Sequence, residues 1–327
     1  MSEESVSLRA YVDRYFGKYL KNDDINEICF NGGNKIWWED IRSDWHCEES
    51  KDFDDKVAYS FATSCASAMK QVFNDSTKPI LSGTLPGGER IQIVSSPVTK
   101  ARYVSITIRK PSRVRYTIED YIKNGILNDV LAEKIGSMVK EGKNIVICGE
   151  TGSGKTTFMK TLIDFIPIED RLITIEDVEE IRFFNHKNFV QLFYPSEAKP
   201  GDSINSAVLL KSCLRMKPSR ILLAEIRGGE TYDFINVISS GHNGSMTSCH
   251  AGSVSSCKDR IVMMAMQNTE ARALGKDMLM DIVDKIIDVI VVLKKVNKRR
   301  MITEYYVDGV TYVNDGEGNF ISSSNNG

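Results

Sequence analysis

A glycine-rich segment in the middle of the chain has the residue types and the spacing of a phosphate-binding loop. Residues 144–157 read NIVICGETGSGKTT, so Gly149 is followed, after four residues, by Gly154, Lys155 and Thr156. An apolar run precedes the loop and a helical pattern follows it, which is the strand–loop–helix context that the motif requires. The sequence therefore predicts a nucleotide site at the beginning of a helix.

Each residue type in this loop has a task in phosphate binding. Glycines let the backbone turn its N–H groups toward one point, and the helix that follows contributes its positive N-terminal end. We expect the ammonium group of Lys155 to bridge the β- and γ-phosphates and the hydroxyl of Thr156 to ligate Mg²⁺. The other candidate contacts to the nucleotide are Gly149, Thr151, Gly152, Ser153, Gly154 and Thr157.

Two predicted strands further along the chain end in acidic residues, which hydrolysis of a bound nucleotide would need for metal and water. The first strand runs into Glu176 and Asp177, and the second into Glu225, with Arg227 two residues later. Such acids lie at the carboxyl edge of the sheet, where ligands bind in open α/β folds. Glu225 has the position of a Walker B acid and could take a proton from water, whereas Glu176 could also belong to a solvated acidic turn.

Two of the four histidines, His242 and His250, bracket a short Ser/Thr-rich strand with glycines on both sides. Either imidazole could donate to a phosphate or respond to its loss. A single histidine is more often structural, so the pattern leaves both roles open.

The bulk composition is that of an ordinary globular protein. The 327 residues are enough for two domains, and 42% of them are hydrophobic. Lys and Arg number 42 against 44 Asp and Glu, so we expect no strong direct binding of nucleic acid. The longest apolar run, 289–293, is too short for a membrane span, and the acidic N-terminus does not have the pattern of a signal peptide.

The seven cysteines are spaced without any C-x-x-C pair, at positions 29, 47, 65, 148, 213, 249 and 257. An odd number of cysteines in apolar segments is typical of reduced thiols in a cytoplasmic protein. We therefore expect a cytoplasmic location and no zinc site.

The arrangement of predicted helices and strands changes along the chain and predicts two domains. Residues 1–111 combine helical segments with alternating strands and indicate a small α+β domain. Residues 112–125 read as a linker with a hinge near its start, at 111–116. Residues 126–313 alternate strands and helices, which predicts a mostly parallel α/β sheet with helices on both faces. Residues 314–327 are rich in Asn, Ser and Gly, and we expect them to be disordered.

Periodicity and turn signals give the expected elements. In the first domain they are helices at 8–20 and 53–73 and strands at 26–30, 35–39, 90–95 and 103–109. Helical segments at 117–121 and 128–141 lead into the second domain. Its strands are expected at 145–148, 172–175, 189–193, 221–225, 245–248, 289–294 and 301–307, and its further helices at 157–166, 203–216, 230–240 and 253–266.

Four segments in this order resemble the characteristic boxes of the secretion ATPase superfamily. GETGSGKTT, ITIEDVEE, RILLAEIRGGE and GHNGSMTSCHAGS are similar to its Walker A, Asp, Walker B and His boxes. Within it, NEICFNGGNKIWWE, GGERIQIVSSPV and ITIRKPS resemble the N-terminal domain of the VirB-type traffic ATPases of type IV secretion systems. The resemblance covers about residues 8–307. Val178 departs from it, because pilus and type II relatives usually carry proline there.

The resemblance implies a RecA-like P-loop NTPase domain, an N-terminal domain that contributes arginines, and a homohexameric Mg-dependent ATPase with ATP between the two domains. Arg90 and Arg109 become candidate phosphate-contacting arginines from the N-terminal domain, and Arg227 joins them after the Walker B box.

The same resemblance assigns roles to the acids and the second histidine. Glu176 and Glu225 would share the duties of metal–water ligand and general base, with Glu225 favoured as the base. His250 would couple the γ-phosphate to the strand behind it. The implied partners are other type IV secretion ATPases, inner-membrane channel proteins and an exported protein or DNA, with the protein peripheral to the inner membrane.

Three alternatives remain at this point. One is a type II secretion or type IV pilus ATPase, whose assembly motors often carry a four-cysteine metal module that this sequence lacks. Another is a nucleic-acid translocase of the same core fold, against which the near-neutral charge argues. The third is a scaffold that binds ATP without turning it over, against which the two placed acids argue.

Overall fold

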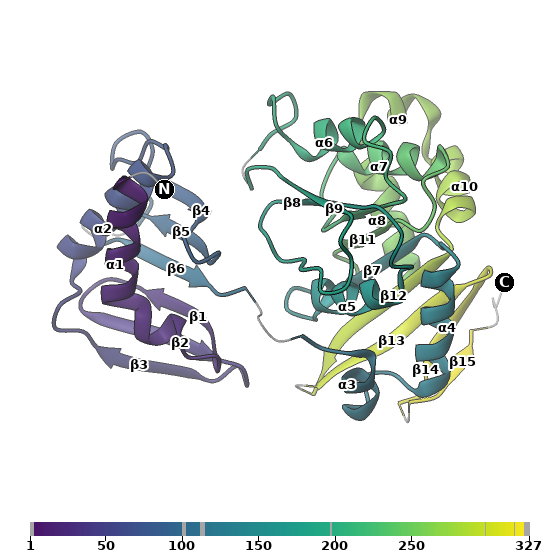
Figure 1. Ribbon diagram of the computed structural model, residues 1–327, viewed down its shortest axis with the longest axis horizontal. Coiled ribbons are helices and arrows are strands. Elements are labelled where there is room, and N and C mark those ends of the chain that lie inside the picture. The colour runs from purple at the N-terminus through teal and green to yellow at the C-terminus, as the bar shows by residue number, and fades with distance from the viewer. Residues whose placement is uncertain are drawn as a thin grey trace. The chain divides into compact units, whose positions relative to one another are not determined.

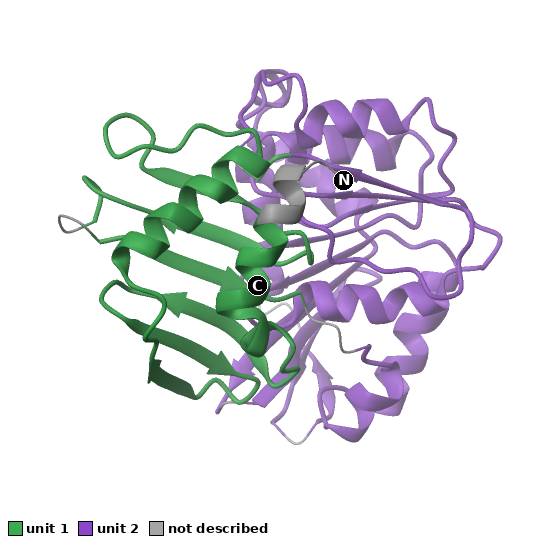
Figure 2. Ribbon diagram, turned by 60° about the vertical axis from the view of Figure 1, so that its left-hand side comes forward, with its two compact units in different colours: residues 1–113, 195–197 green, residues 114–194, 198–327 purple. Residues whose placement is uncertain are grey.

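Two β-sheets organise the chain, one in each of two compact units (Figures 1 and 2). Unit 1 comprises residues 1–113 and 195–197, and unit 2 comprises residues 114–194 and 198–327. The computed structural model describes residues 3–99, 103–111, 115–196, 198–297, 299–316 and 318–323, with side chains from residue 8 onward. The middle of the predicted hinge, 112–114, lies outside these residues. Among the helices that are described, none is long and apolar enough to cross a bilayer.

Unit 1 is an antiparallel sheet with two helices across one face (Figure 1). Its elements are α1 (Glu3–Leu20), β1 (Ile25–Phe30), β2 (Lys35–Asp40), β3 (Trp45–Glu49), α2 (Asp55–Ala68), β4 (Ile80–Thr84), β5 (Arg90–Val94) and β6 (Ser105–Arg109). The strand order is β3-β2-β1-β6-β5-β4. Alternate apolar residues of the strands meet the helices in one core, where Phe16, Phe53 and Phe61 are fully buried.

The elements of unit 1 differ from the sequence prediction in two respects. The helix expected at 53–73 is shorter, because Lys70 has a left-handed φ of 55° and the N–H of Gln71 closes the helix end on the carbonyl of Ala66 at 2.9 Å. The pattern also misses β3 and β4. β3 is an edge strand with mostly exposed side chains, so it lacks the alternation that marks a half-buried strand.

Unit 2 is built on a sheet in which six adjacent strands are parallel. Its strands are β7 (Ile145–Gly149), β8 (Leu172–Glu176), β9 (Phe189–Phe193), β10 (Arg220–Leu223), β11 (Met246–Cys249), β12 (Val289–Val296), β13 (Arg299–Val307), β14 (Val310–Asn314) and β15 (Phe320–Ser322). The order is β15-β14-β13-β12-β7-β11-β10-β8-β9. The strands from β12 to β9 in this order run parallel, and β13 to β15 extend the sheet antiparallel. The predicted mostly parallel sheet is confirmed.

Helices cover both faces of this sheet, as the alternation of strands and helices predicts. They are α3 (Ile118–Lys123), α4 (Asp129–Lys140), α5 (Lys155–Leu162), α6 (Ser206–Cys213), α7 (Glu230–Ser239), α8 (Val254–Ala265), α9 (Thr269–Leu274) and α10 (Lys276–Ile286). One core joins the sheet to α6–α10, and a second core joins the opposite face to α3, α4 and α5. The central strand β7 is therefore buried on both sides, and only its end is available for chemistry.

The prediction of disorder over 314–327 is wrong for its middle part. Phe320 begins β15, and its ring packs at 5.0 Å edge-on to Tyr305, which stacks on Tyr312 at 4.6 Å. This aromatic packing outweighs the polar composition of the segment. Residues 324–327 lie outside the described part of the chain.

Six of the seven cysteines are buried, and Cys47 on β3 is exposed. Burial raises the pKa of Cys65 to about 12 and that of Cys213 to about 11. These two buried thiols therefore stay protonated at neutral pH and react slowly.

Candidate active site

The phosphate loop leaves the carboxyl end of β7 and leads into α5. Gly149 has no room for a side chain, because a β-carbon there would lie 2.2 Å from the backbone oxygen of Leu293 on the neighbouring strand β12. Gly152 and Gly154 have left-handed φ angles of 75° and 98°, which glycine adopts without strain. Close packing and backbone geometry therefore both require glycine at the turns of this loop.

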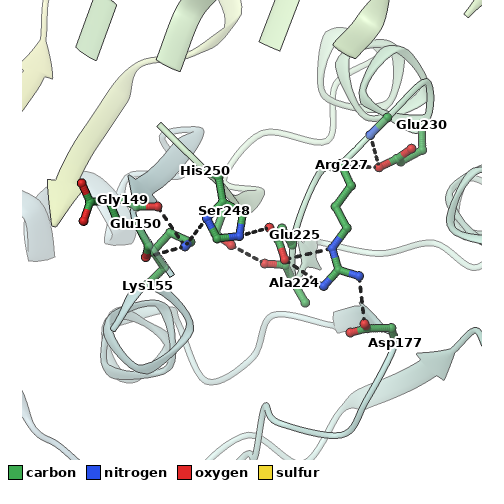
Figure 3. Close-up of polar contacts among 11 residues, drawn as sticks. Gly149, Glu150, Lys155, Asp177, Ala224, Glu225, Arg227, Glu230, Ser248 and His250 are labelled. Atoms are coloured by element: carbon green, nitrogen blue, oxygen red, sulfur yellow. Dashed lines mark hydrogen bonds and ion pairs between the residues drawn. The ribbon is translucent and has the colours of Figure 1, made fainter. Parts of the chain in front are cut away.

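The ammonium group of Lys155 is held inside the loop. The residue is 8% exposed. Its Nζ donates to the carbonyl oxygens of Gly149 at 3.0 Å and Glu150 at 3.1 Å, and Nδ1 of His250 lies 3.2 Å from the same nitrogen (Figure 3). Lys155 therefore connects the phosphate loop with the residue that follows β11.

A line of charged side chains continues from His250 (Figure 3). Its Nε2 lies 2.9 Å from Oε1 of Glu225. Oε2 of Glu225 accepts hydrogen bonds from Nε and Nη2 of Arg227 at 3.0 and 2.9 Å. Nη1 of Arg227 donates to Oδ2 of Asp177 at 3.0 Å. Since β8, β10 and β11 are parallel neighbours, the residues that follow them meet at one edge of the sheet.

The contacts of His250 fix which of its nitrogens carries the proton. An ammonium group can only donate, so Nδ1 must accept from Lys155. A neutral imidazole then carries its proton on Nε2, which lies 2.9 Å from Oε1 of Glu225 but outside hydrogen-bond geometry. Next to this pair, the hydroxyl of Ser248 donates to the carbonyl of Ala224 at 2.7 Å and so ties the ends of β11 and β10 together.

Arg227 is a charged link between two carboxylates. Burial lowers the pKa of Arg227, but Asp177 and Glu225 together raise it by more, so the pKa lies above its ordinary value. Oε1 of Glu230 accepts from the backbone N–H groups of Arg227 at 2.6 Å and Gly228 at 2.9 Å. These bonds fix the turn that connects Glu225 with α7.

The structure does not bring Glu176 to this line of residues, and its share in the metal–water chemistry stays a prediction. Glu176 is fully buried, and Oε2 accepts from the backbone N–H groups of Glu180 at 2.8 Å and Ile181 at 2.9 Å. Its Oε1 accepts from the hydroxyl of Thr174 at 3.0 Å. Burial raises the pKa of Glu176, and these hydrogen bonds offset part of the rise. Oε2 thus holds the loop after β8, and Oε1 is bonded within the strand.

Asp177, the neighbour of Glu176, is the acid of this segment that contacts Arg227. The segment ITIEDVEE contains both acids, and their order alone does not tell which one turns toward Arg227. The contact of Asp177 with Arg227 could have been predicted from the strand geometry, because consecutive side chains at a strand end point to opposite sides.

His242 lies apart from the group that contains His250. Its Nδ1 is 3.2 Å from the carbonyl of Val237 near the end of α7. Since β11 runs between the two histidines, they belong to opposite edges of the sheet. The structural role is therefore the one that fits His242.

The loop fits a phosphate chain and a cation that the phosphates bring with them. Ser153 is 1% exposed, and its hydroxyl has no hydrogen-bond partner within the described residues. Thr156 and Thr157 are half-buried at the start of α5, and Thr151 is exposed on the loop. In the part of the chain that the structure describes, no three His, Cys, Asp or Glu side chains are grouped to hold a metal. The hydroxyl of Thr156 stays the predicted ligand of Mg²⁺, an ion that prefers oxygen ligands.

The two arginines predicted from the N-terminal domain lie side by side in unit 1. Arg90 on β5 and Arg109 on β6 are register partners in the antiparallel sheet, and Glu27 on β1 is the next partner of Arg109. Burial raises the pKa of Glu27, and the charge of Arg109 lowers it in part. The pair thus shares one face of the sheet, and its contact with the nucleotide stays a prediction.

Comparison with known proteins relates nearly the whole chain to secretion proteins. The family "Type II/IV secretion system protein" matches residues 18–313. The type IV secretion system protein VirB11 of Brucella abortus biovar 1 (strain 9-941) is 44% identical in an alignment of 297 residues, with 84% of this chain and 82% of that protein covered. The crystal structure of the VirB11 ATPase of Brucella suis in complex with sulphate is 39% identical with a TM-score of 0.51, covering 94% of this chain and 96% of the other. The ATPase DotB of Legionella pneumophila is 18% identical with a TM-score of 0.61, covering 96% and 82%, and shares the fold.

Proposed function

The chain belongs to the family of type II/IV secretion system proteins and is a secretion ATPase, and we propose that it works as a homohexamer that powers export through a type IV secretion system. The 44% identity to a type IV secretion protein places it on the type IV side of the family, so the type II or pilus alternative is not favoured. ATP hydrolysis would drive substrate export or pilus assembly by closing and opening the two units.

One observation supports hydrolysis rather than nucleotide binding alone: the line of contacts from Lys155 through His250 to Glu225. A carboxylate thus lies next to the imidazole that we propose to sense phosphate at the end of the phosphate loop. A scaffold that only binds nucleotide would not need this acid.

Binding of ATP would change the partners of Lys155. In the structure, its ammonium group donates hydrogen bonds to two loop carbonyls and to Nδ1 of His250. A phosphate chain in the loop offers stronger, charged acceptors, so Lys155 would turn toward the phosphates and release Nδ1. His250 would then report phosphate occupancy to Glu225 through Nε2.

Glu225 would act as the general base. Its Oε2 is held by the fork of Arg227, which fixes the orientation of the carboxylate. Oε1 faces His250 and is the oxygen that would take the proton from the attacking water. Asp177 would hold the other side of Arg227 so that the guanidinium cannot leave Glu225.

Mg²⁺ would enter with the nucleotide, and Thr156 is the residue that would hold it. Bound there, the cation neutralises part of the negative charge that develops on the phosphates. Lys155 and the backbone N–H groups of the loop would supply the rest of the stabilisation.

Arg90 and Arg109 would reach the phosphates from unit 1 when the units close. Their shared face presents two guanidinium forks to one anion. We expect the protein to act in the cytoplasm at the inner membrane, together with other secretion ATPases and channel proteins, on an exported protein or DNA.

Two substitutions test hydrolysis. K155A should abolish turnover and leave the fold intact, because the loop loses its only side-chain cation while its backbone is unchanged. E225Q should still bind ATP but lower kcat by about 100-fold or more, the usual contribution of a general base. The measurements are phosphate release, ATP binding by calorimetry and circular dichroism. Rapid hydrolysis by E225Q would remove Glu225 as the base, and full activity of K155A would refute the site.

A further inference from the structure

The hairpin between β12 and β13 extends past the phosphate loop on the side away from His250. Leu293 on β12 is paired with Gly149, the last residue of β7, so the rest of β12 continues beyond the end of its neighbour. The chain then turns back, and Arg300 on β13 is paired with Lys295 in this overhang. The topology therefore places the pair Lys295 and Arg300 beyond the end of β7, next to the loop rather than next to the body of the sheet.

Arg300 reaches from this overhang to the glycines of the loop. Its Nε donates to the carbonyl oxygen of Gly152 at 3.4 Å. A β-carbon on Gly154 would lie 3.4 Å from its Cδ and 3.6 Å from its Nε. The side chain thus lies along the outside of the loop, while Lys155 occupies the inside.

Most of the hydrogen-bonding capacity of Arg300 is unused. A guanidinium group has five N–H donors, of which the contact with Gly152 takes one. Within the described residues, Nη1 and Nη2 of Arg300 make no further hydrogen bond or ion pair, and the residue is exposed. A charged fork with free donors beside a phosphate loop has the geometry and charge to bind a phosphate oxygen.

We propose that Arg300 is a phosphate-binding residue of the ATP site, supplied by the C-terminal hairpin of the same chain. The proposal rests on the proposed function. Lys155 would grip the phosphate chain from within the loop and Arg300 would bind it from the opposite side, so the loop would be closed between two cations. The carbonyl of Gly152 would hold the guanidinium in place until the nucleotide arrives.

The neighbour Arg299 provides a matched control. It carries the same charge on the same strand, is exposed, and as the adjacent strand residue points to the other side. Loss of a direct phosphate contact should affect R300A and spare R299A, whereas loss of the general positive field of the hairpin would affect both.

The test is binding of MgADP and of adenosine by calorimetry, together with ATPase kinetics, on R300A, R300K and R299A. R300A should weaken MgADP binding and raise the KM for ATP by about 10- to 100-fold, with kcat and adenosine binding within a factor of two or three. R300K should recover part of the loss, because it restores the charge without the fork. R299A should bind MgADP like the wild type.

Several results would overturn the proposal. One is R300A that binds MgADP normally, another is an equal loss for adenosine, which would mean a damaged loop, and a third is an equal loss in R299A. If the wild type binds MgADP but hydrolyses no ATP, the proposed function fails while the binding comparison still decides the role of Arg300. A wild type that binds no MgADP would overturn both.

Discussion

At the scale of single residues, the site is a series in which each polar or charged side chain contacts the next. Lys155, His250, Glu225, Arg227 and Asp177 follow one another at hydrogen-bond distance. Removing one side chain takes away one of the contacts of its neighbour. The effects of substitutions in this series on ATPase activity should therefore not be additive.

The different contacts of Glu176 and Asp177 give a direct prediction. D177N should lower kcat by roughly 10-fold, because Arg227 loses the carboxylate that holds it against Glu225. E176Q should keep kcat within a factor of two, since the oxygen of the side-chain amide that it introduces can accept the same two backbone N–H bonds. Phosphate release at saturating ATP decides between them. If E176Q loses more activity than D177N, the assignment from the sequence pattern is right and ours is not.

Glu176 also makes the stability of unit 2 depend on pH. Burial raises its pKa in the folded state, so the folded protein binds the proton more tightly than the unfolded chain does. This contribution to the free energy of unfolding is therefore present at low pH and is lost as the pH rises from the ordinary value, 4.5, through the raised value. E176Q cannot ionise, so its stability relative to wild type should increase over that range.

Urea unfolding of wild type, E176Q and E176A between pH 4.5 and 7.5 measures this effect. At pH 4.5, E176A should be destabilised by about 2 kcal/mol or more, because two backbone N–H groups lose their acceptor. A constant gap between E176Q and wild type across the range would contradict the pH argument.

At the scale of elements, the phosphate loop depends on how closely β12 approaches β7. G149A would place a methyl group 2.2 Å from the backbone oxygen of Leu293, and backbone cannot move aside as a flexible side chain would. We expect a loss of about 1–3 kcal/mol of stability and a still larger loss of ATP affinity, because the loop must shift. A matched G201A change, on a loop with open space at that position, should leave ATP affinity unchanged. Equal ATP affinities for G149A and wild type would contradict this account.

What the sequence could predict at this scale depends on how local the signal is. The phosphate loop and the parallel sheet follow from short-range patterns, namely glycine spacing and the alternation of strands with helices. Which of Glu176 and Asp177 contacts Arg227 depends on the loop that folds back onto β8. That loop has no sequence periodicity from which its path could be predicted. Arg300 is far along the chain from Gly152 and becomes its neighbour only through the strand order. β15 depends on the packing of Phe320 against Tyr305, a contact that local secondary-structure propensity does not predict.

At the scale of the whole molecule, the proposed motor depends on arginines in one unit and a loop in the other. We expect Arg109 to serve the nucleotide of its own chain. Hexamers mixed from K155A and R109A chains should then stay inactive, because no chain has both residues. Phosphate release at several mixing ratios, with light scattering to confirm six chains, measures this. Recovery of activity in the mixture would mean that Arg109 acts on the neighbouring chain.

The exposed thiol of Cys47 provides a natural site for attaching a label. It is the one exposed thiol among the described residues, it lies on unit 1, and the other six cysteines are buried. A maleimide fluorophore should therefore attach to the wild-type protein at a single position, far in sequence from the phosphate loop. Changes in its anisotropy or quenching during turnover would follow the motion of this unit in real time, without any engineered labelling site.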